Sequence, residues 1–271
     1  MLKIPFYQVD AFTDQAFKGN PAAVCVLDTW LSDHLLQQIA AENNLSETAF
    51  IVPLATGYEL RWFTPTTEVE LCGHATLAAA YVIFNYLGHA SPQIEFTTRY
   101  RGQLLVAQTD DGLTLDFPSC PATPCPTPPI LKAAIGVEPE EVLFADDYLV
   151  ILANEDQVKN IDINRPLLMQ LDGRGVIISA RGKDSDIVSR FFAPKYGIDE
   201  DPVTGSAHCT LTPYWCAQFG KNTLVAQQIS ARTGSIRCKL HNNRVLLHGQ
   251  AVLIIEGKLY YDVPLSLPNA S

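Results

Sequence analysis

The feature that most constrains this chain is a duplicated pattern in which a short polar loop leads into an apolar helix. The first copy runs from Gly73 to Gly88 and the second from Gly205 to Gly220, so each interval spans 15 positions. A glycine just past the last apolar residue is a common way to end a helix. The same order of strand, turn and helix in both halves indicates an internal repeat with a period of about half the chain.

The repeat extends upstream of both helices. Residues 61–65 (Arg-Trp-Phe-Thr-Pro) precede the first helix, and residues 190–194 (Arg-Phe-Phe-Ala-Pro) precede the second. The offset between the copies is 129 at these strands and 132 at Gly73 and Gly205, so the second loop has gained three residues. The pattern therefore predicts a duplicated lobe and not a solenoid.

The two helix starts are candidate binding sites. A helix N-terminus presents unpaired N–H groups and a partial positive charge, which suits a carboxylate or phosphate. Gly73 and His74 open the first helix, and Gly205 and Ser206 open the second. For a single turn, a glycine that merely lets helix and strand pack closely is the better interpretation. Two such turns that both carry polar residues favour a site that clamps a small anionic substrate.

Length and proline content predict where the chain divides. The sequence has 271 residues, enough for about two domains. Residues 118–129 contain six prolines in twelve positions and are the candidate linker. We therefore expect an N-terminal lobe at 1–118 with the Gly73/His74 helix start, and a C-terminal lobe at 119–271 with the Gly205/Ser206 start. The last strand is free to return to the first lobe.

Composition argues against several classes of function. The formal net charge is −10 and no lysine or arginine cluster stands out, so we expect no nucleic-acid partner. No apolar run is long enough to span a membrane, and no signal-peptide segment precedes the first strand, so we expect a cytoplasmic protein. The seven cysteines contain no CxxC pair, so we expect neither a disulfide framework nor a metal site.

Glu47 occupies an unusual place in a predicted strand at 45–52. Alternation puts it on one face with Leu45, Ala49 and Ile51, while Phe50 and Val52 make the other face apolar too. An acid in such a strand is either an edge or paired residue or a functional acid, and the spacing alone leaves both open.

Local signals predict several other elements. Ser32 is the expected cap of a helix that ends near residues 43–44. Pro213 lies inside the second apolar helix and predicts a kink or an early break there. Residues 225–261 read as a meander of strands, and we expect the tail from Pro264 to be loose.

Four motifs together resemble one known family. They are residues 19–24 (GNPAAV), 46–50 (SETAF), 72–76 (CGHAT) and 201–208 (DPVTGSAH). They occur in the order found in the phenazine-biosynthesis PhzF-like family, which shares the fold of diaminopimelate epimerase. The resemblance is to members whose substrate is unknown. It implies an α+β fold of two pseudo-symmetric lobes, each a β-barrel-like mixed sheet around a central helix. It also implies a homodimer with its site between the lobes and with neither cofactor nor metal.

The resemblance assigns roles to individual residues. Glu47 matches the family's acid/base, which moves a proton on the substrate. His74, Asp201 and Ser206 match residues that hold and polarise the substrate. Asn20, in the first motif, is a further candidate for substrate binding.

Three functions follow as hypotheses. The leading one is a PhzF-like isomerase that moves a proton within a small carboxylate by Glu47 acid/base catalysis, with Asp201 and His74 assisting. The second is an epimerase or racemase that uses Cys72, although Pro202 stands where diaminopimelate epimerase has its second cysteine. The third is a non-catalytic protein that binds a small molecule or a partner on the same fold.

Overall fold

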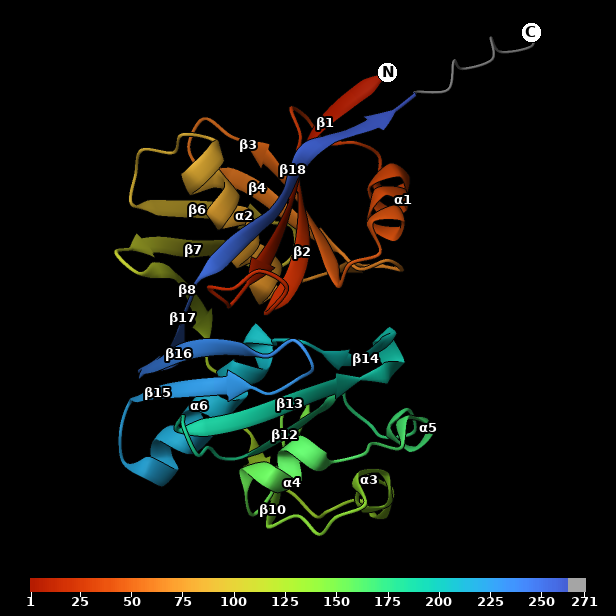
Figure 1. Cartoon of the computed structure of the whole chain (residues 1–271), viewed down its shortest axis with the longest axis vertical. Helices are drawn as coiled ribbons and strands as arrows, with labels where there is room; N and C mark the ends of the chain where they lie inside the picture. Colours follow the sequence, from red (N-terminus) through yellow and green to blue (C-terminus); the bar gives the residue numbers. More distant parts are fainter. Residues whose placement is uncertain (263–271) are drawn as a thin grey trace, which may run out of the picture.

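Two apolar helices, each enclosed by strands, organise the structure. The computed structural model describes residues 1–262 and shows an α+β protein with an upper and a lower body (Figure 1). The tail from Pro264, for which the sequence predicts a loose end, lies outside this range. No helix in residues 1–262 has the length and apolar character needed to cross a membrane.

The helices are short apart from the two that carry the repeat. Their bounds are α1 Asp33–Asn43, α2 Gly73–Tyr86, α3 Pro129–Ile135, α4 Glu155–Asn160, α5 Arg165–Leu168 and α6 Gly205–Phe219, with a 3₁₀ turn at Pro194–Tyr196.

Most strands of the upper body come first along the chain. They are β1 Leu2–Ala11, β2 Asn20–Val26, β3 Glu47–Pro53, β4 Tyr58–Phe63, β5 Glu68–Val69, β6 Gln93–Thr98, β7 Gly102–Thr109 and β8 Gly112–Pro118. The remaining strands are β9 Thr123–Pro124, β10 Glu141–Phe144, β11 Tyr148–Ile151, β12 Val176–Arg181, β13 Ile187–Ala193, β14 Ile198–Asp201, β15 Thr223–Gln228, β16 Gly234–His241, β17 Arg244–Gly249 and β18 Ala251–Tyr261.

The two halves repeat one sheet topology. In the first, β3 runs parallel to β2 and antiparallel to β4, and β4 pairs with β5 before α2 begins. In the second, β12 runs parallel to β11 and antiparallel to β13, and β13 pairs with β14 before α6 begins. The pair Trp62–Val69 in the first half corresponds to Phe191–Asp201 in the second, with the same offsets of 129 and 132. The duplication read from the sequence is therefore present in the strand register.

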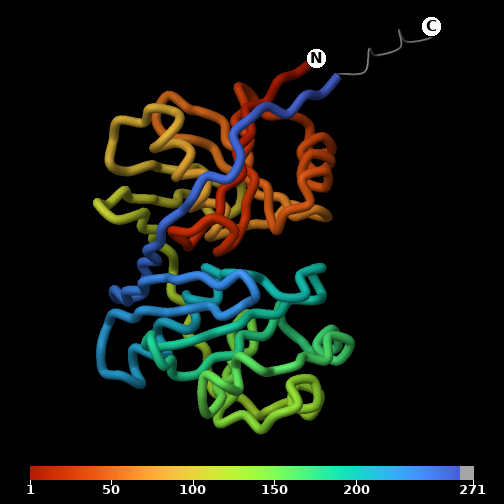
Figure 2. The backbone as a smooth tube through the Cα atoms, viewed as in Figure 1, coloured from red at the N-terminus to blue at the C-terminus, as the bar shows by residue number. Residues whose placement is uncertain are grey.

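The strands continue from one body to the other. β17 pairs with β8, and β18 pairs with β1 along its length. Figure 2 follows this last strand, in blue, back into the upper body beside the N-terminus. We retain 1–118 and 119–271 as a proposed division of the chain.

Each half also repeats one ion pair beside its helix start. Arg61 Nε donates to Glu68 Oε1 at 2.7 Å, and Arg190 Nε donates to Glu200 Oε1 at 2.7 Å. A second bond from each Nη2 to the other carboxylate oxygen makes both pairs bidentate. A two-point contact fixes the guanidinium plane and so holds the strand that leads into the helix.

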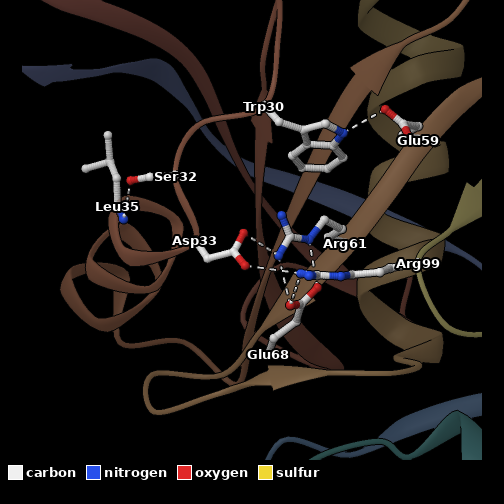
Figure 3. Close-up of polar contacts among 8 residues, drawn as sticks. All are labelled: Trp30, Ser32, Asp33, Leu35, Glu59, Arg61, Glu68 and Arg99. Carbon is white, nitrogen blue, oxygen red and sulfur yellow. Dashed lines mark hydrogen bonds and ion pairs between the residues drawn. The ribbon is translucent and has the colours of Figure 1, made fainter.

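The first of these pairs belongs to a larger polar cluster (Figure 3). Asp33, at the start of α1, accepts hydrogen bonds from both Arg61 and Arg99, and Arg99 also contacts Glu68. Trp30 donates from its indole to Glu59 at 2.6 Å. The cluster ties the start of α1 to β4 and β5. As predicted, Ser32 caps α1 and Asn44 ends it in the left-handed conformation.

The expected early break at Pro213 is wrong, because α6 continues from Gly205 to Phe219. A proline in a helix leaves the carbonyl four residues earlier without its partner. Here that carbonyl belongs to Cys209, and it accepts a hydrogen bond from the backbone N–H of Cys120 at 3.0 Å. The proline-rich segment thus supplies the donor that Pro213 lacks.

Candidate active site

The starts of α2 and α6 meet at their glycines. A Cβ added to Gly73 would lie 3.3 Å from the Cα of Gly205, and one added to Gly205 would lie 3.4 Å from the Cα of Gly73. Neither helix has a hydrogen bond from a capping side chain at its N-terminus. Two positive helix ends with unsatisfied N–H groups therefore face the same place.

Glu47 lies beside the first helix start and is paired there. It is the first residue of β3, an interior strand, and is 8% exposed. Its Oε2 is 3.1 Å from Nε2 of His74, the second residue of α2. On the other side of the ring, Nδ1 lies 3.5 Å from Sγ of Cys72. The structure thus places an acid, an imidazole and a thiol in one buried row.

Asn20 joins this row to the second half of the chain. Its side-chain Nδ2 donates to Asp201 Oδ1 at 2.7 Å and to the carbonyl of Val203 at 2.9 Å, and it lies 3.1 Å from Nδ1 of His74. Asp201 also accepts from the hydroxyl of Thr204 at 2.5 Å. Four of the candidate residues, Asn20, Glu47, His74 and Asp201, are therefore buried together.

Burial and mutual charge shape the protonation of this group. The pKa of Asp201 is raised to about 6, chiefly by burial and also by Glu47, although His74 opposes the shift. Burial alone would lower the pKa of His74, but its neighbours Cys72 and Glu47 outweigh burial and raise it well above 6.5. Burial also raises the pKa of the Cys72 thiol to about 11, so Cys72 is neutral near pH 7. Glu47 is therefore the partner that can keep His74 protonated at neutral pH.

Ser206 lies apart from the buried row, on the second residue of α6. Its Oγ accepts a hydrogen bond from Nη2 of Arg174 at 2.9 Å. Arg174 is in turn bonded through Nε and Nη2 to both carboxylate oxygens of Asp147. Sequence reasoning missed Arg174 and Asp147 because neither belongs to a motif, and only the fold brings them to Ser206.

Gln228 was also missed, although it holds the second loop in place. It is fully buried, and its amide accepts from the backbone N–H of Thr204 and donates to the backbone carbonyl of Asp201. It lies in a strand of alternating pattern, where a polar residue gives no signal of such a role.

One group of side chains has the composition of a metal site. Candidate ligand atoms of Glu47, Cys72 and His74 all lie within 4.8 Å of one another. However, His74 turns Nε2 toward Glu47 and Nδ1 toward Cys72, and a single ion binds one ring nitrogen. The arrangement fits a proton-transfer network better than a tetrahedral centre.

Comparisons with known proteins agree on one family. The family model described as phenazine biosynthesis-like protein matches residues 9–257. A Pseudomonas aeruginosa protein named as an uncharacterized isomerase is 49% identical over 259 residues, which cover 96% of this chain and all of that protein. A crystal structure of a PhzF-family protein from Enterococcus faecalis superposes with a TM-score of 0.93 at 45% identity, covering 96% of this chain and all of that one. A hydroxyproline epimerase from Agrobacterium vitis, at 9% identity and a TM-score of 0.62, shares the fold over 97% of this chain and 94% of its own.

Proposed function

This chain is an isomerase that belongs to the phenazine biosynthesis-like family, and we propose that Glu47 moves a proton within a small carboxylate substrate. The substrate would lie where the starts of α2 and α6 meet. The proposed chemistry is acid/base transfer by a side chain and requires no cofactor.

One observation carries this proposal. Within residues 1–262, seven buried side-chain nitrogen or oxygen atoms have no hydrogen-bond partner, and three of them are Glu47 Oε2, His74 Nε2 and Asn20 Oδ1. Glu47 and His74 are close enough for an ion pair, yet neither atom has a geometrically acceptable hydrogen bond. Buried polar atoms without partners are costly, and they gather where a ligand completes their bonding.

The proposed reaction begins when Glu47 takes a proton from a substrate carbon. The C–H bond breaks, an O–H bond forms on Glu47, and the electron pair spreads into the adjacent unsaturated or carboxylate group. Glu47 then returns the proton at another carbon, so the substrate is isomerised with no net change in composition. Backbone N–H groups at the two helix starts would stabilise the developing negative charge. His74 and Asp201 would orient a polar substituent of the substrate.

The test is the exchange of substrate hydrogen for solvent deuterium. A panel of small unsaturated and hydroxy carboxylates is incubated with the protein in D2O, and incorporation is read by mass spectrometry and NMR. General acid–base groups contribute about 10²–10⁴-fold, so Glu47→Gln should slow exchange of any active compound by at least that factor. Glu95→Gln, at an exposed position of β6, is the matched control and should exchange at the normal rate.

Stability separates a chemical role from a structural one. Glu47→Gln keeps the shape of the side chain, so its melting temperature should stay within a few degrees of the wild-type value. Normal exchange in the variant would remove Glu47 from the mechanism. A large fall in melting temperature would instead identify Glu47 as a structural partner of His74.

A cysteine-dependent epimerase is the second candidate, favoured by the 3.5 Å contact between Cys72 and His74. A thiolate nucleophile or base needs a lowered pKa, whereas burial raises that of Cys72. Cys72→Ala decides between them, because exchange that survives the substitution excludes Cys72 and exchange that disappears supports it. An absence of exchange with every compound of the panel would count against proton transfer at carbon in this site.

A further inference from the structure

Arg174 is held rigidly beside the second helix start. It lies between α5 and β12, and its Nε and Nη2 donate to Asp147 at 3.0 and 2.5 Å. Asp147 is 2% exposed, and the guanidinium also lies 5.3 Å from the ring of Phe191. A two-point bond to a buried carboxylate and a ring face together fix the plane of the guanidinium.

This arrangement gives Ser206 a free hydrogen. A guanidinium can only donate, so Ser206 Oγ is the acceptor in the 2.9 Å bond from Arg174. The hydroxyl hydrogen of Ser206 is then left for another acceptor. Nη1 of Arg174 also makes no hydrogen bond to any residue in the range 1–262, which leaves two more N–H groups beside the same hydroxyl.

The internal repeat gives this cluster a counterpart in the first half. His74 and Ser206 are each the second residue of their helix. His74 contacts Glu47, at the start of β3, and Ser206 contacts Arg174, two residues before the start of the corresponding strand β12. The duplicated fold therefore places an acid beside one helix start and a cation beside the other.

We propose that Arg174, positioned by Asp147, is a further substrate-binding residue that joins Ser206 in holding the carboxylate of the substrate. The assignment rests on the proposed function of the same site and names which end of the cleft holds the anion. The ligand would accept from Ser206 Oγ, from Nη1 of Arg174 and from N–H groups of the first turn of α6. A singly charged carboxylate suits the subsite better than a phosphate dianion, because Asp146 and Asp201 also lie near the guanidinium.

The experiment measures binding of sodium acetate by ¹H–¹⁵N NMR at constant ionic strength. Acetate should shift the signals of the Ser206 amide and the Arg174 Nε–H saturably in the wild-type protein. Acetamide, which has the same shape without the charge, should not shift them, and inorganic phosphate should bind more weakly than acetate. Hydrogen bonds to charged groups predict that Arg174→Gln weakens acetate binding about 10–100-fold.

Three further variants make the result specific. Arg174→Lys keeps the charge without the two-point geometry and should be intermediate, while Ser206→Ala should weaken acetate without loss of fold. If Arg174→Gln does not fold, the acetate affinities of these two variants test the proposal instead. Arg181→Gln is the matched control, since Arg181 packs on Phe219 at the far end of α6 and should leave acetate affinity unchanged.

Several results would overturn the proposal. They are an absence of saturable shifts in the wild-type protein, acetate affinity in Arg174→Gln equal to wild type, or phosphate binding tighter than acetate. Binding of acetate does not depend on proton transfer, so the two proposals fail separately. If Arg174→Gln weakens acetate binding but Glu47→Gln leaves exchange unchanged, only the catalytic role of Glu47 would be refuted. If instead Glu47→Gln abolishes exchange while Arg174→Gln leaves the KM unchanged, only this subsite would be refuted.

Discussion

The contact between Gly73 and Gly205 predicts a strong coupling between two substitutions that are 132 positions apart. Each alanine would put a methyl group about as close to the opposite Cα as packed atoms can come, at 3.3 and 3.4 Å. Phe117 closes a third side, 3.5 Å from a Cβ at Gly73. The space between the helix starts therefore accepts one methyl group with difficulty and two only if the helices separate.

Two opposing effects determine how much each single substitution changes the free energy of unfolding. Overpacking costs about 1–3 kcal/mol, and replacing a helical glycine by alanine returns up to about 1 kcal/mol. Gly73→Ala or Gly205→Ala alone should therefore lower the free energy of unfolding by about 0–3 kcal/mol. In the double variant both methyl groups need the same space, so we expect an additional coupling energy of about 1–3 kcal/mol.

A double-mutant cycle measured by urea unfolding tests this expectation. The matched control is Gly257→Ala, since Gly257 has nothing within 4 Å of an added Cβ, and combining it with Gly73→Ala should give an additive result. Each helix-start alanine should also slow deuterium exchange, because a displacement of about 1 Å at a catalytic site costs about 100-fold. Additive effects of Gly73→Ala and Gly205→Ala would show that the two helix starts do not touch in solution.

Two further predictions concern stability. Burial lowers the pKa of His208 to about 4 although its Nδ1 donates to the carbonyl of Thr204, so the unfolded chain takes up the proton first as the pH falls below about 6.5. The wild-type protein should therefore lose about 3 kcal/mol of its free energy of unfolding between pH 7 and pH 4 through His208, and His208→Gln should not show this loss. Urea unfolding across that range measures it, and a variant with the same pH profile as the wild type would contradict it. Arg190→Met should lower the free energy of unfolding by about 2–4 kcal/mol because it leaves the half-buried Glu200 unpaired. Arg165→Met, which breaks an exposed pair, should cost less than about 1 kcal/mol, and equal losses for the two would refute this account.

The repeat was predictable from sequence because residues close together in the chain produce it. Each copy has a glycine that ends its helix, and an arginine and a phenylalanine two positions apart in the strand before it. Such local patterns favour the same local structure in both halves. The structure shows the repeated Arg61–Glu68 and Arg190–Glu200 pairs that these patterns support. The α+β fold and the family expected from the motifs are both confirmed.

The parts that sequence did not reveal depend on contacts between distant segments. Pro213 was expected to kink α6 or to end it early, and nothing local shows that Cys120 donates to the carbonyl that the proline leaves free. Arg174 and Asp147 stand in loops without a motif, and they meet because the strands that follow them, β12 and β11, pair with each other. The roles assigned to Glu47 and the other site residues remain proposals.

The duplication explains why one fold can separate the two tasks of the proposed reaction. Two equivalent helix starts supply N–H groups from both sides, so neither half alone determines where an anion lies. The side chains beside them break that equivalence. In the proposed reaction Glu47 and His74 serve proton transfer at the first start, and Asp147 holds the Arg174 guanidinium fixed at the second. In the proposed reaction the asymmetric side chains would set the direction of substrate binding, and the contact between Gly73 and Gly205 would keep the proton-transfer residues of one half close to the anion site of the other.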